Sequence, residues 1–214
     1  MIIGIFDSGI GGEALAHELQ KTFPSAKLTI ANDKSHLPYG DKTQTEVTQL
    51  TNEAIQPLLA QSCDVIVIAC NTASTLTIDN LRETYPNQLF IGIEPMVKTA
   101  STRTKSKVIA VCATPATLAS HRYAKLVKKY AAHLTLLEPD CSEWAYMIEN
   151  NLINKEKIAE KIEEVCREGA DVIVLGCTHY HWIKDLITQV ADGRAQVLEP
   201  SEAIGRRVKH LLGV

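Results

Sequence analysis

The sequence predicts an α/β protein with two pseudo-symmetric lobes, each built on a doubly wound parallel sheet. Two stretches carry this prediction, residues 64–72 (DVIVIACNT) and residues 171–179 (DVIVLGCTH). Each has an aspartate, four β-branched or leucine residues, a small residue, a cysteine and then polar residues. Apolar runs this short are typical of strands buried on both faces, as in parallel sheets. Cys70 and Cys177 lie half of the 214-residue chain apart, which indicates an internal repeat.

The first half of the chain alternates between predicted strands and helices. Apolar side chains at three- and four-residue steps predict a helix that runs from about Val47 to Leu59, and Asn71 or Thr72 is expected to cap the helix after the first cysteine. The polar segment 32–40, with its Pro-Tyr-Gly turn, is expected to be a loop. We expect strands at residues 2–6, 27–31, 64–69 and 89–93.

The second half repeats this order, with Glu199-Pro200 matching Glu94-Pro95. By position, Asp7 falls opposite Thr114 and Tyr39 opposite Tyr146. We expect strands at residues 107–111, 133–137, 172–175 and 195–198, and a last helix at 202–212. The expected lobes are residues 1–96 with 199–214, and residues 97–198. Ligands bind beyond the carboxyl ends of parallel strands, so the active site is expected in the cleft between the lobes.

Composition excludes several classes of partner and site. The formal net charge of −3 favours neither a nucleic-acid nor a membrane partner, and no apolar run approaches the ~20 residues of a membrane span. The N-terminus lacks the features of a signal peptide, and the six cysteines form no CxxC pair. We therefore expect reduced thiols in a cytoplasmic protein, with no structural metal. The glycine-rich turn at 7–12 does not match GxGxxG, so simple turn glycines are favoured over a nucleotide site.

Cys70 and Cys177 are the candidate reactive groups. Each ends a strand and precedes an expected helix, a position that lowers a thiol pKa from about 8.5. Asp7 ends the neighbouring strand and can serve Cys70 as a proton partner, and His179 can serve Cys177. Hydroxyl and amide side chains are expected at the same edge, which suits a small ligand bearing a carboxylate. These are Ser8, Asn71, Thr72, Thr114, Thr117 and Thr178.

Four motifs resemble, in the same order, those of the glutamate racemases within the aspartate/glutamate racemase family. They are residues 4–12 (GIFDSGIGG), 38–40 (PYG), 69–73 (ACNTA) and 175–180 (LGCTHY). The resemblance implies racemisation of an acidic amino acid without a cofactor, with L- and D-glutamate as substrates and D-glutamate supplied to peptidoglycan. A homodimer is a further assembly that is compatible with the resemblance.

The resemblance implies a role for each motif residue. Cys70 and Cys177 would be the thiolate/thiol pair, with Asp7 beside Cys70, His179 beside Cys177, and Glu149 assisting the second cysteine. The implied substrate-holding positions are Asp7, Ser8, Pro38, Tyr39, Gly40, Asn71, Thr72, Thr114, Thr117, Thr178 and His179. An aspartate or broad-specificity racemase is an alternative. A two-lobed protein that binds a dicarboxylate without catalysis is another, although a binder needs neither cysteine.

The chain departs from the family pattern in three places. His181 stands where a proline commonly follows the Cys-Thr-His-Tyr motif, and Cys141-Ser142 keeps the cysteine of a Cys-Pro pair without its proline. Family members are usually longer after Glu199-Pro200. We therefore expect the pocket near Cys177 and the subunit contacts to differ from those of the family.

Overall fold

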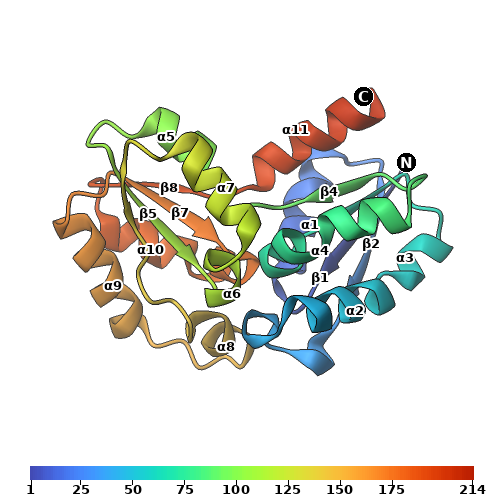
Figure 1. Ribbon diagram of the computed structural model, residues 1–214, viewed down its shortest axis with the longest axis horizontal. Helices are drawn as coiled ribbons and strands as arrows, with labels where there is room; N and C mark the ends of the chain where they lie inside the picture. Colours follow the sequence, from blue (N-terminus) through green and yellow to red (C-terminus); the bar gives the residue numbers. More distant parts are fainter. The chain divides into compact units, whose positions relative to one another are not determined.

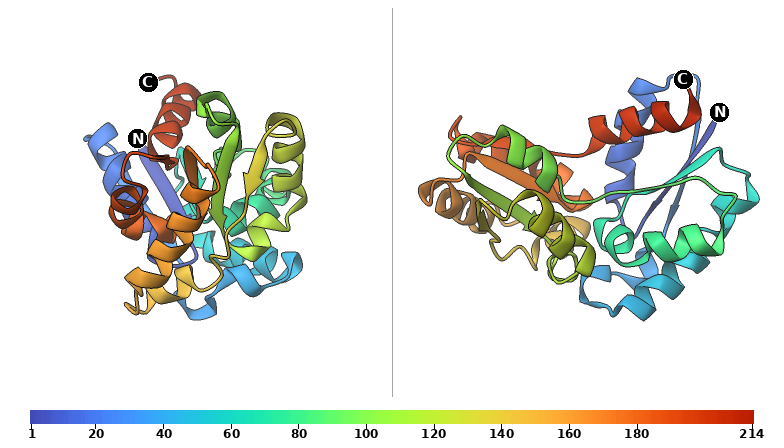
Figure 2. Two further views of the ribbon diagram at one scale, coloured as in Figure 1. Left: turned by 90° about the vertical axis from the view of Figure 1, so that its left-hand side faces the viewer. Right: turned by 45° about the horizontal axis from the view of Figure 1, so that its top comes forward.

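The computed structural model describes residues 1–214 and contains two compact units, Met1–Glu94 with Pro200–Val214 and Pro95–Glu199. Each unit has a four-stranded parallel sheet (Figures 1 and 2). The strand orders are β2-β1-β3-β4 and β6-β5-β7-β8, so the same topology occurs twice. The prediction of two doubly wound α/β sheets is confirmed.

The first unit contains four strands, five α-helices and two short 3₁₀ helices. They are β1 (Ile2–Asp7), α1 (Gly11–Thr22), β2 (Lys27–Asn32), η1 (Lys34–His36), η2 (Tyr39–Asp41), α2 (Gln44–Ala54), α3 (Gln56–Ala60), β3 (Val65–Ile68), α4 (Asn71–Thr84), β4 (Phe90–Gly92) and α11 (Ser201–Leu212).

Strand β3 is buried on both faces because its apolar side chains alternate between two cores. Val65 and Val67 pack on the side of α1 and α11. Ile66 and Ile68 pack on the side of α2 and α4. Helix α11, from the end of the chain, lies beside α1 (Figure 2). This two-sided burial is what a continuous apolar run predicts.

The helix expected to continue to Leu59 is divided into α2 and α3. Pro57 lies in the first turn of α3, where it has no N–H to donate and its ring crowds the preceding turn. The segment expected as a loop at 32–40 contains η1 and the start of η2.

The second unit contains four strands, six α-helices and one 3₁₀ helix. They are α5 (Val97–Arg103), β5 (Val108–Ala113), α6 (Pro115–Leu118), α7 (His121–Tyr130), β6 (Thr135–Leu137), α8 (Trp144–Glu149), α9 (Lys155–Arg167), β7 (Val172–Gly176), η3 (Thr178–Ile183), α10 (Lys184–Ala191) and β8 (Gln196–Leu198).

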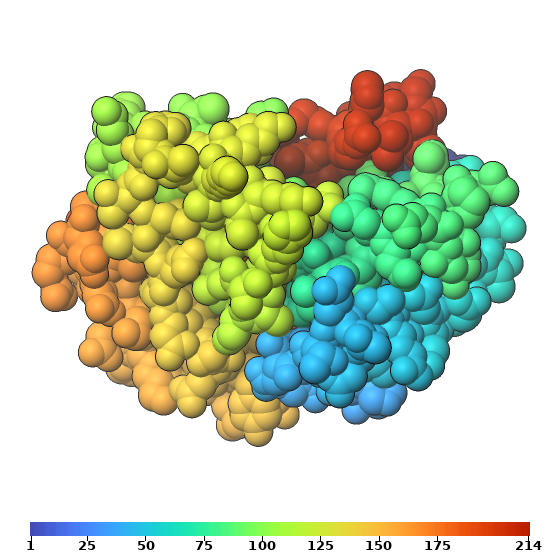
Figure 3. Space-filling view, in the orientation of Figure 1, coloured from blue at the N-terminus to red at the C-terminus, as the bar shows by residue number.

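Helices α5 and α7 cover one face of the second sheet, and α7 forms part of the surface seen in Figure 3. The sequence did not predict α5, whose β-branched and hydroxyl residues have weak helix propensity. Val97 and Ala100 are fully buried against the sheet, so tertiary packing stabilises this helix.

All six cysteines are free thiols. No group of three or more His, Cys, Asp or Glu side chains is arranged to hold a metal ion. None of the helices has both the length and the apolar content required to cross a membrane.

Candidate functional site

Each candidate cysteine has a hydroxyl residue beside it at the carboxyl edge of its own sheet. Phe6 pairs with Ile68, so Ser8 lies beside Cys70 two positions further on. Ala113 pairs with Gly176, so Thr114 lies beside Cys177. Ser8 is therefore the counterpart of Thr114, and the positional match of Asp7 with Thr114 was wrong by one residue.

This register leaves the two units chemically different. Asp7 corresponds to Ala113, so only the first unit has a carboxylate at this position. Asp7 is completely buried, and its Oδ2 accepts a hydrogen bond from the Gly9 N–H at 3.1 Å. The first cysteine thus lies near a buried carboxylate that has no counterpart in the second unit.

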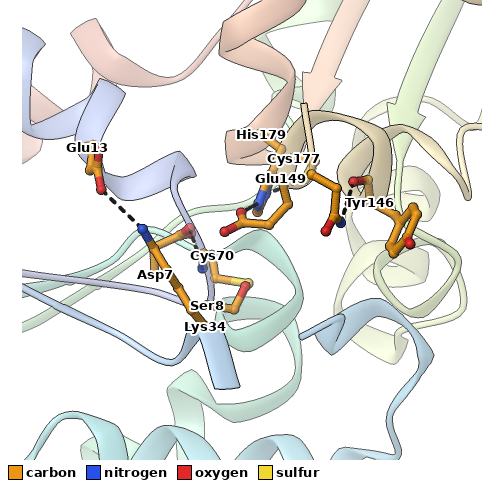
Figure 4. Close-up of polar contacts among 11 residues, drawn as sticks. Asp7, Ser8, Glu13, Lys34, Cys70, Tyr146, Glu149, Cys177 and His179 are labelled. Atoms are coloured by element: carbon orange, nitrogen blue, oxygen red, sulfur yellow. Dashed lines mark hydrogen bonds and ion pairs between the residues drawn. The ribbon is translucent and has the colours of Figure 1, made fainter. Parts of the chain in front are cut away.

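Cys70 is buried at the start of α4, where its Sγ accepts two hydrogen bonds. The Ser8 hydroxyl donates at 3.3 Å (Figure 4) and the Ala73 N–H at 3.4 Å. The cysteine is itself the N-cap of α4, the place where Asn71 or Thr72 was expected. Its sulfur takes the position that a capping oxygen usually occupies.

The expected lowering of the Cys70 pKa is wrong. Burial, together with the negative charge of Asp7, raises the pKa of this thiol to about 11. The hydrogen bonds from Ala73 and Ser8 act in the opposite direction but do not compensate. Desolvation of the thiolate therefore outweighs the favourable helix N-terminus, and Cys70 is a neutral thiol near pH 7.

Tyr39 is held in the first unit by a network from the segment after β2. Its hydroxyl donates to Asp33 Oδ2 at 2.8 Å, and Asp33 Oδ1 contacts His36 Nδ1 at 2.7 Å. Burial and the Asp33 carboxylate raise the Tyr39 pKa well above its ordinary value, so the phenol stays protonated. The ring lies against Phe6, with centroids 6.4 Å apart. Pro38 and Gly40 flank Tyr39 and are partly exposed.

Asn71 is the most conspicuous polar residue of the first unit. Its side chain is 2% exposed, and neither amide atom has a hydrogen-bond partner. A buried amide without partners costs about 1–3 kcal/mol. Such an amide at the carboxyl edge of the sheet is suited to a polar ligand. Thr72, the next residue, is also buried.

Cys177 begins a chain of contacts within the second unit. Its Sγ lies 3.8 Å from His179 Nδ1, and His179 Nε2 lies 2.6 Å from Glu149 Oε2 (Figure 4). The side chains of His179 and Glu149 are 4% and 15% exposed. Glu149 therefore reaches the cysteine through the imidazole, which it orients.

The segment after Cys177 differs from the expected α-helix. It forms the 3₁₀ helix η3, and α10 starts only at Lys184. Cys177 has no capping hydrogen bond of the kind made by Cys70. The Tyr180 N–H donates to the Cys177 carbonyl at 3.1 Å, and its hydroxyl donates to the Cys141 carbonyl at 3.0 Å. The sequence motif contained Tyr180 but did not indicate this contact, which joins η3 to the segment before α8.

Thr114 and Thr117 lie at the start of α6, where Thr114 is the N-cap. The Thr114 hydroxyl donates to Thr117 Oγ1 at 3.0 Å, and both residues are buried. Thr178 is buried beside Cys177. The positional match of Tyr39 with Tyr146 does not extend to their surroundings, because Tyr39 is 2% and Tyr146 56% exposed.

His181, at the position where the family pattern has proline, lies against Glu199. The distance from His181 Nδ1 to Glu199 Oε2 is 3.6 Å, and Lys184 Nζ lies 3.8 Å from Glu199 Oε1. The substitution thus brings an ionisable side chain to η3, where it contacts the residue that follows β8.

Buried thiols at the strand ends, each with a hydroxyl neighbour and an acid/base partner, are typical of an enzyme that transfers protons. The sequence profile of the Asp/Glu/Hydantoin racemase family matches residues 13–206. The chain therefore belongs to the Asp/Glu/Hydantoin racemase family, a class of isomerases. The resemblance seen in the four motifs is confirmed.

The relatives specify the branch of the family. Glutamate racemase of Ectopseudomonas mendocina (strain ymp) is 33% identical, over 99% of this chain and 82% of its own. The glutamate racemase structure from Francisella tularensis subsp. tularensis SCHU S4, in complex with D-glutamate, is 29% identical, with a TM-score of 0.79 over 98% of this chain and 80% of its own. Escherichia coli glutamate racemase, 24% identical, shares the fold with a TM-score of 0.88 over 99% of this chain and 82% of its own.

Proposed function

We propose that this protein is a glutamate racemase that interconverts L- and D-glutamate without a cofactor. The observation that carries the proposal is the matched placement of Cys70 and Cys177. Cys70 lies two positions beyond the end of β3 and Cys177 one position beyond the end of β7, and each is buried beside a hydroxyl residue. The names of the relatives and the D-glutamate bound to the Francisella protein support glutamate as substrate.

Racemisation inverts one carbon and needs a base for one face and an acid for the other. In our proposal one cysteine, as thiolate, takes the α-proton of glutamate, and the electron pair of the broken C–H bond is delocalised into the α-carboxylate. The other cysteine, as thiol, then delivers its proton to the opposite face. The net reaction exchanges one proton for another, and each turnover exchanges the protonation states of the two cysteines.

The surroundings of the cysteines suggest how each is served. Cys70 is kept neutral by burial and by Asp7, so it is a proton donor in the resting protein. When Cys70 must act as a base, Asp7 is the adjacent carboxylate that accepts its proton. For Cys177 the contact with His179, itself held by Glu149, supplies the acid/base partner.

Substrate binding must compensate for the weak acidity of the α-proton. We assign the carboxylates and ammonium group of glutamate to the polar residues at the two sheet edges, where hydrogen-bond donors stabilise the developing carbanion. Asn71 is the principal candidate because its buried amide lacks any protein partner. The further candidates are Asp7, Ser8, Pro38, Tyr39, Gly40, Thr72, Thr114, Thr117, Thr178 and His179.

We further propose that the two compact units act as the two functional lobes, each contributing one cysteine, and that the product D-glutamate serves peptidoglycan synthesis. Growth of a D-glutamate auxotroph carrying this gene, without added D-glutamate, tests the physiological role. Failure to rescue despite activity in vitro would remove that role alone.

Incubation of the purified protein with L-glutamate in D₂O tests the chemistry. We expect D-glutamate to form and deuterium to appear at the α-carbon, measured by chiral chromatography and proton NMR. The Cys70→Ser and Cys177→Ser variants should lose racemisation. Parallel assays with aspartate separate an aspartate or broad-specificity racemase. Binding of glutamate by calorimetry without any exchange would instead identify a dicarboxylate-binding protein.

A further inference from the structure

One segment of the second unit is rich in basic residues and has no acidic ones. Residues 95–137 contain no aspartate or glutamate, whereas the rest of the chain holds all 25 acidic residues and 14 of the 22 basic ones. The formal net charge of −3 therefore conceals a separation of charge along the chain. The basic residues of the segment, here called the basic face, are Lys98, Arg103, Lys105, Lys107, Arg122, Lys125, Lys128 and Lys129.

The fold brings six of these eight residues into one helical layer, two on α5 and four on α7. Helices α5 and α7 lie side by side on the second sheet (Figure 1). Lys98 from α5 and Lys129 from α7 both place their Nζ over the ring of Tyr130, at 5.6 and 5.2 Å from its centre. Lys125 and Lys128 are exposed on α7. They lie within about one helical turn of Lys129.

The connection from α5 to β5 presents further basic side chains on an ordered backbone. Asp171 accepts hydrogen bonds from the Thr104 hydroxyl at 2.6 Å and from the N–H groups of Lys105 and Ser106 at 2.6 and 2.8 Å. The Asp171 carboxylate thus bonds to the Thr104 hydroxyl and to backbone N–H groups, and the side chains of Lys105 and Lys107 are exposed.

No carboxylate pairs with the lysines of α7, which are Lys125, Lys128 and Lys129. Helix α9 offers the contrast, since its acidic and basic residues alternate along the chain. Lys157 pairs with Glu143 at 3.0 Å, and Lys161 pairs with Glu164 at 3.0 Å. Lys157 and Lys161 of α9 thus have carboxylate partners, whereas the lysines of α7 have none.

We propose that the basic face binds the phosphate backbone of nucleic acid. A polyanion complements a surface rich in lysine and arginine, and lysine and arginine contacts to phosphate supply sequence-independent affinity. This function is separate from racemisation and does not depend on it.

The composition of the surface favours nucleic acid over other polyanionic partners. None of the large apolar side chains that the structure leaves exposed belongs to residues 95–137. A membrane-binding helix needs apolar side chains to insert between lipids. A stable protein–protein interface needs an apolar or aromatic centre. A phosphate backbone requires neither.

Fluorescence anisotropy with a labelled mixed-sequence DNA duplex of about 20 base pairs tests the proposal. The protein should bind at about 50 mM salt, and the logarithm of its affinity should fall linearly with the logarithm of the salt concentration, with a slope near −0.9 per phosphate neutralised. K125E/K128E/K129E should weaken binding at least tenfold. K155E/K157E/K161E on α9, with the same change of net charge, should weaken it less than threefold.

K125A/K128A/K129A provides a milder change, and circular dichroism checks that each variant folds. The racemase assay should give unchanged rates for the α7 variants. Absence of binding by the unmodified protein would overturn the proposal, as would equal losses in the α7 and α9 variants. Binding to vesicles of phosphatidylglycerol in the absence of DNA binding would also overturn it, and would assign the face to a membrane.

Discussion

Glu149→Gln tests the contact that orients His179 beside Cys177. The glutamine keeps the size of the side chain and removes its negative charge. In the native protein Glu149 Oε2 lies 2.6 Å from His179 Nε2. A neutral amide cannot stabilise a positive imidazole as a carboxylate does, so proton transfer at Cys177 should slow.

The geometry sets the magnitude of this effect. The side chains of His179 and Glu149 are 4% and 15% exposed, so solvent screens their contact little. A hydrogen bond to a charged group contributes about 1.5–3 kcal/mol. If the transition state loses this amount, kcat/KM should fall about 10- to 150-fold. The loss should appear mainly in kcat, because Glu149 acts through His179 and not on the substrate.

Circular dichroism follows the interconversion of L- and D-glutamate and gives kcat and KM in both directions. A melting curve checks that the variant folds. Glu138→Gln is the matched control, since Glu138 Oε1 accepts a hydrogen bond of 2.7 Å from the Tyr123 hydroxyl in the same unit. We expect the control to change kcat/KM less than threefold. A Glu149→Gln protein with rates within twofold of the unmodified enzyme would refute the role assigned to this contact.

Three further predictions concern single residues. Asn71→Leu removes a buried amide that has no partners, so it should raise the free energy of unfolding, measured with urea, by about 1–3 kcal/mol. The same variant should have a higher KM for glutamate. An unchanged KM would argue against contact between Asn71 and the substrate. Alkylation of Cys70 by iodoacetamide, followed by mass spectrometry, should accelerate toward pH 11, since burial and Asp7 raise its pKa to about 11, and Asp7→Asn should move the rise to lower pH. The same shift means that the stability Cys70 contributes is present below about pH 8.5, where the unfolded thiol begins to ionise, and is lost as the pH rises toward 11. Asp171→Asn should lower the melting temperature more than Asp64→Asn. Asp171 accepts three hydrogen bonds from residues 104–106, whereas Asp64 accepts one, from the Ile2 N–H. Equal losses of melting temperature in the two variants would contradict this reasoning.

Local pattern was sufficient where burial on both faces decides the structure. The apolar runs before Cys70 and Cys177 predicted β3 and β7, since a parallel strand covered on both faces admits few polar residues. The same pattern placed both cysteines at carboxyl edges. Helix α5 was missed because its stability comes from Val97 and Ala100 packing on the sheet, not from its own propensity.

Residue counts alone could not show that Ser8 of the first unit holds the position equivalent to Thr114 of the second. The two halves differ by one residue between the first strand and the cysteine strand, and only the sheet register shows which side chains are neighbours. A shift of one position changes the residue beside the cysteine from a carboxylate to a hydroxyl.

The sequence by itself determined the repeated α/β pattern, the family and the candidate residues, because motif identity and apolar periodicity are local properties of the chain. Only the tertiary structure decided the ionisation of Cys70. Its place at a helix N-terminus predicts a lowered pKa, but full burial beside Asp7 raises it to about 11. The desolvation of a charge depends on every atom packed around it, and those atoms come from segments that are distant in the sequence.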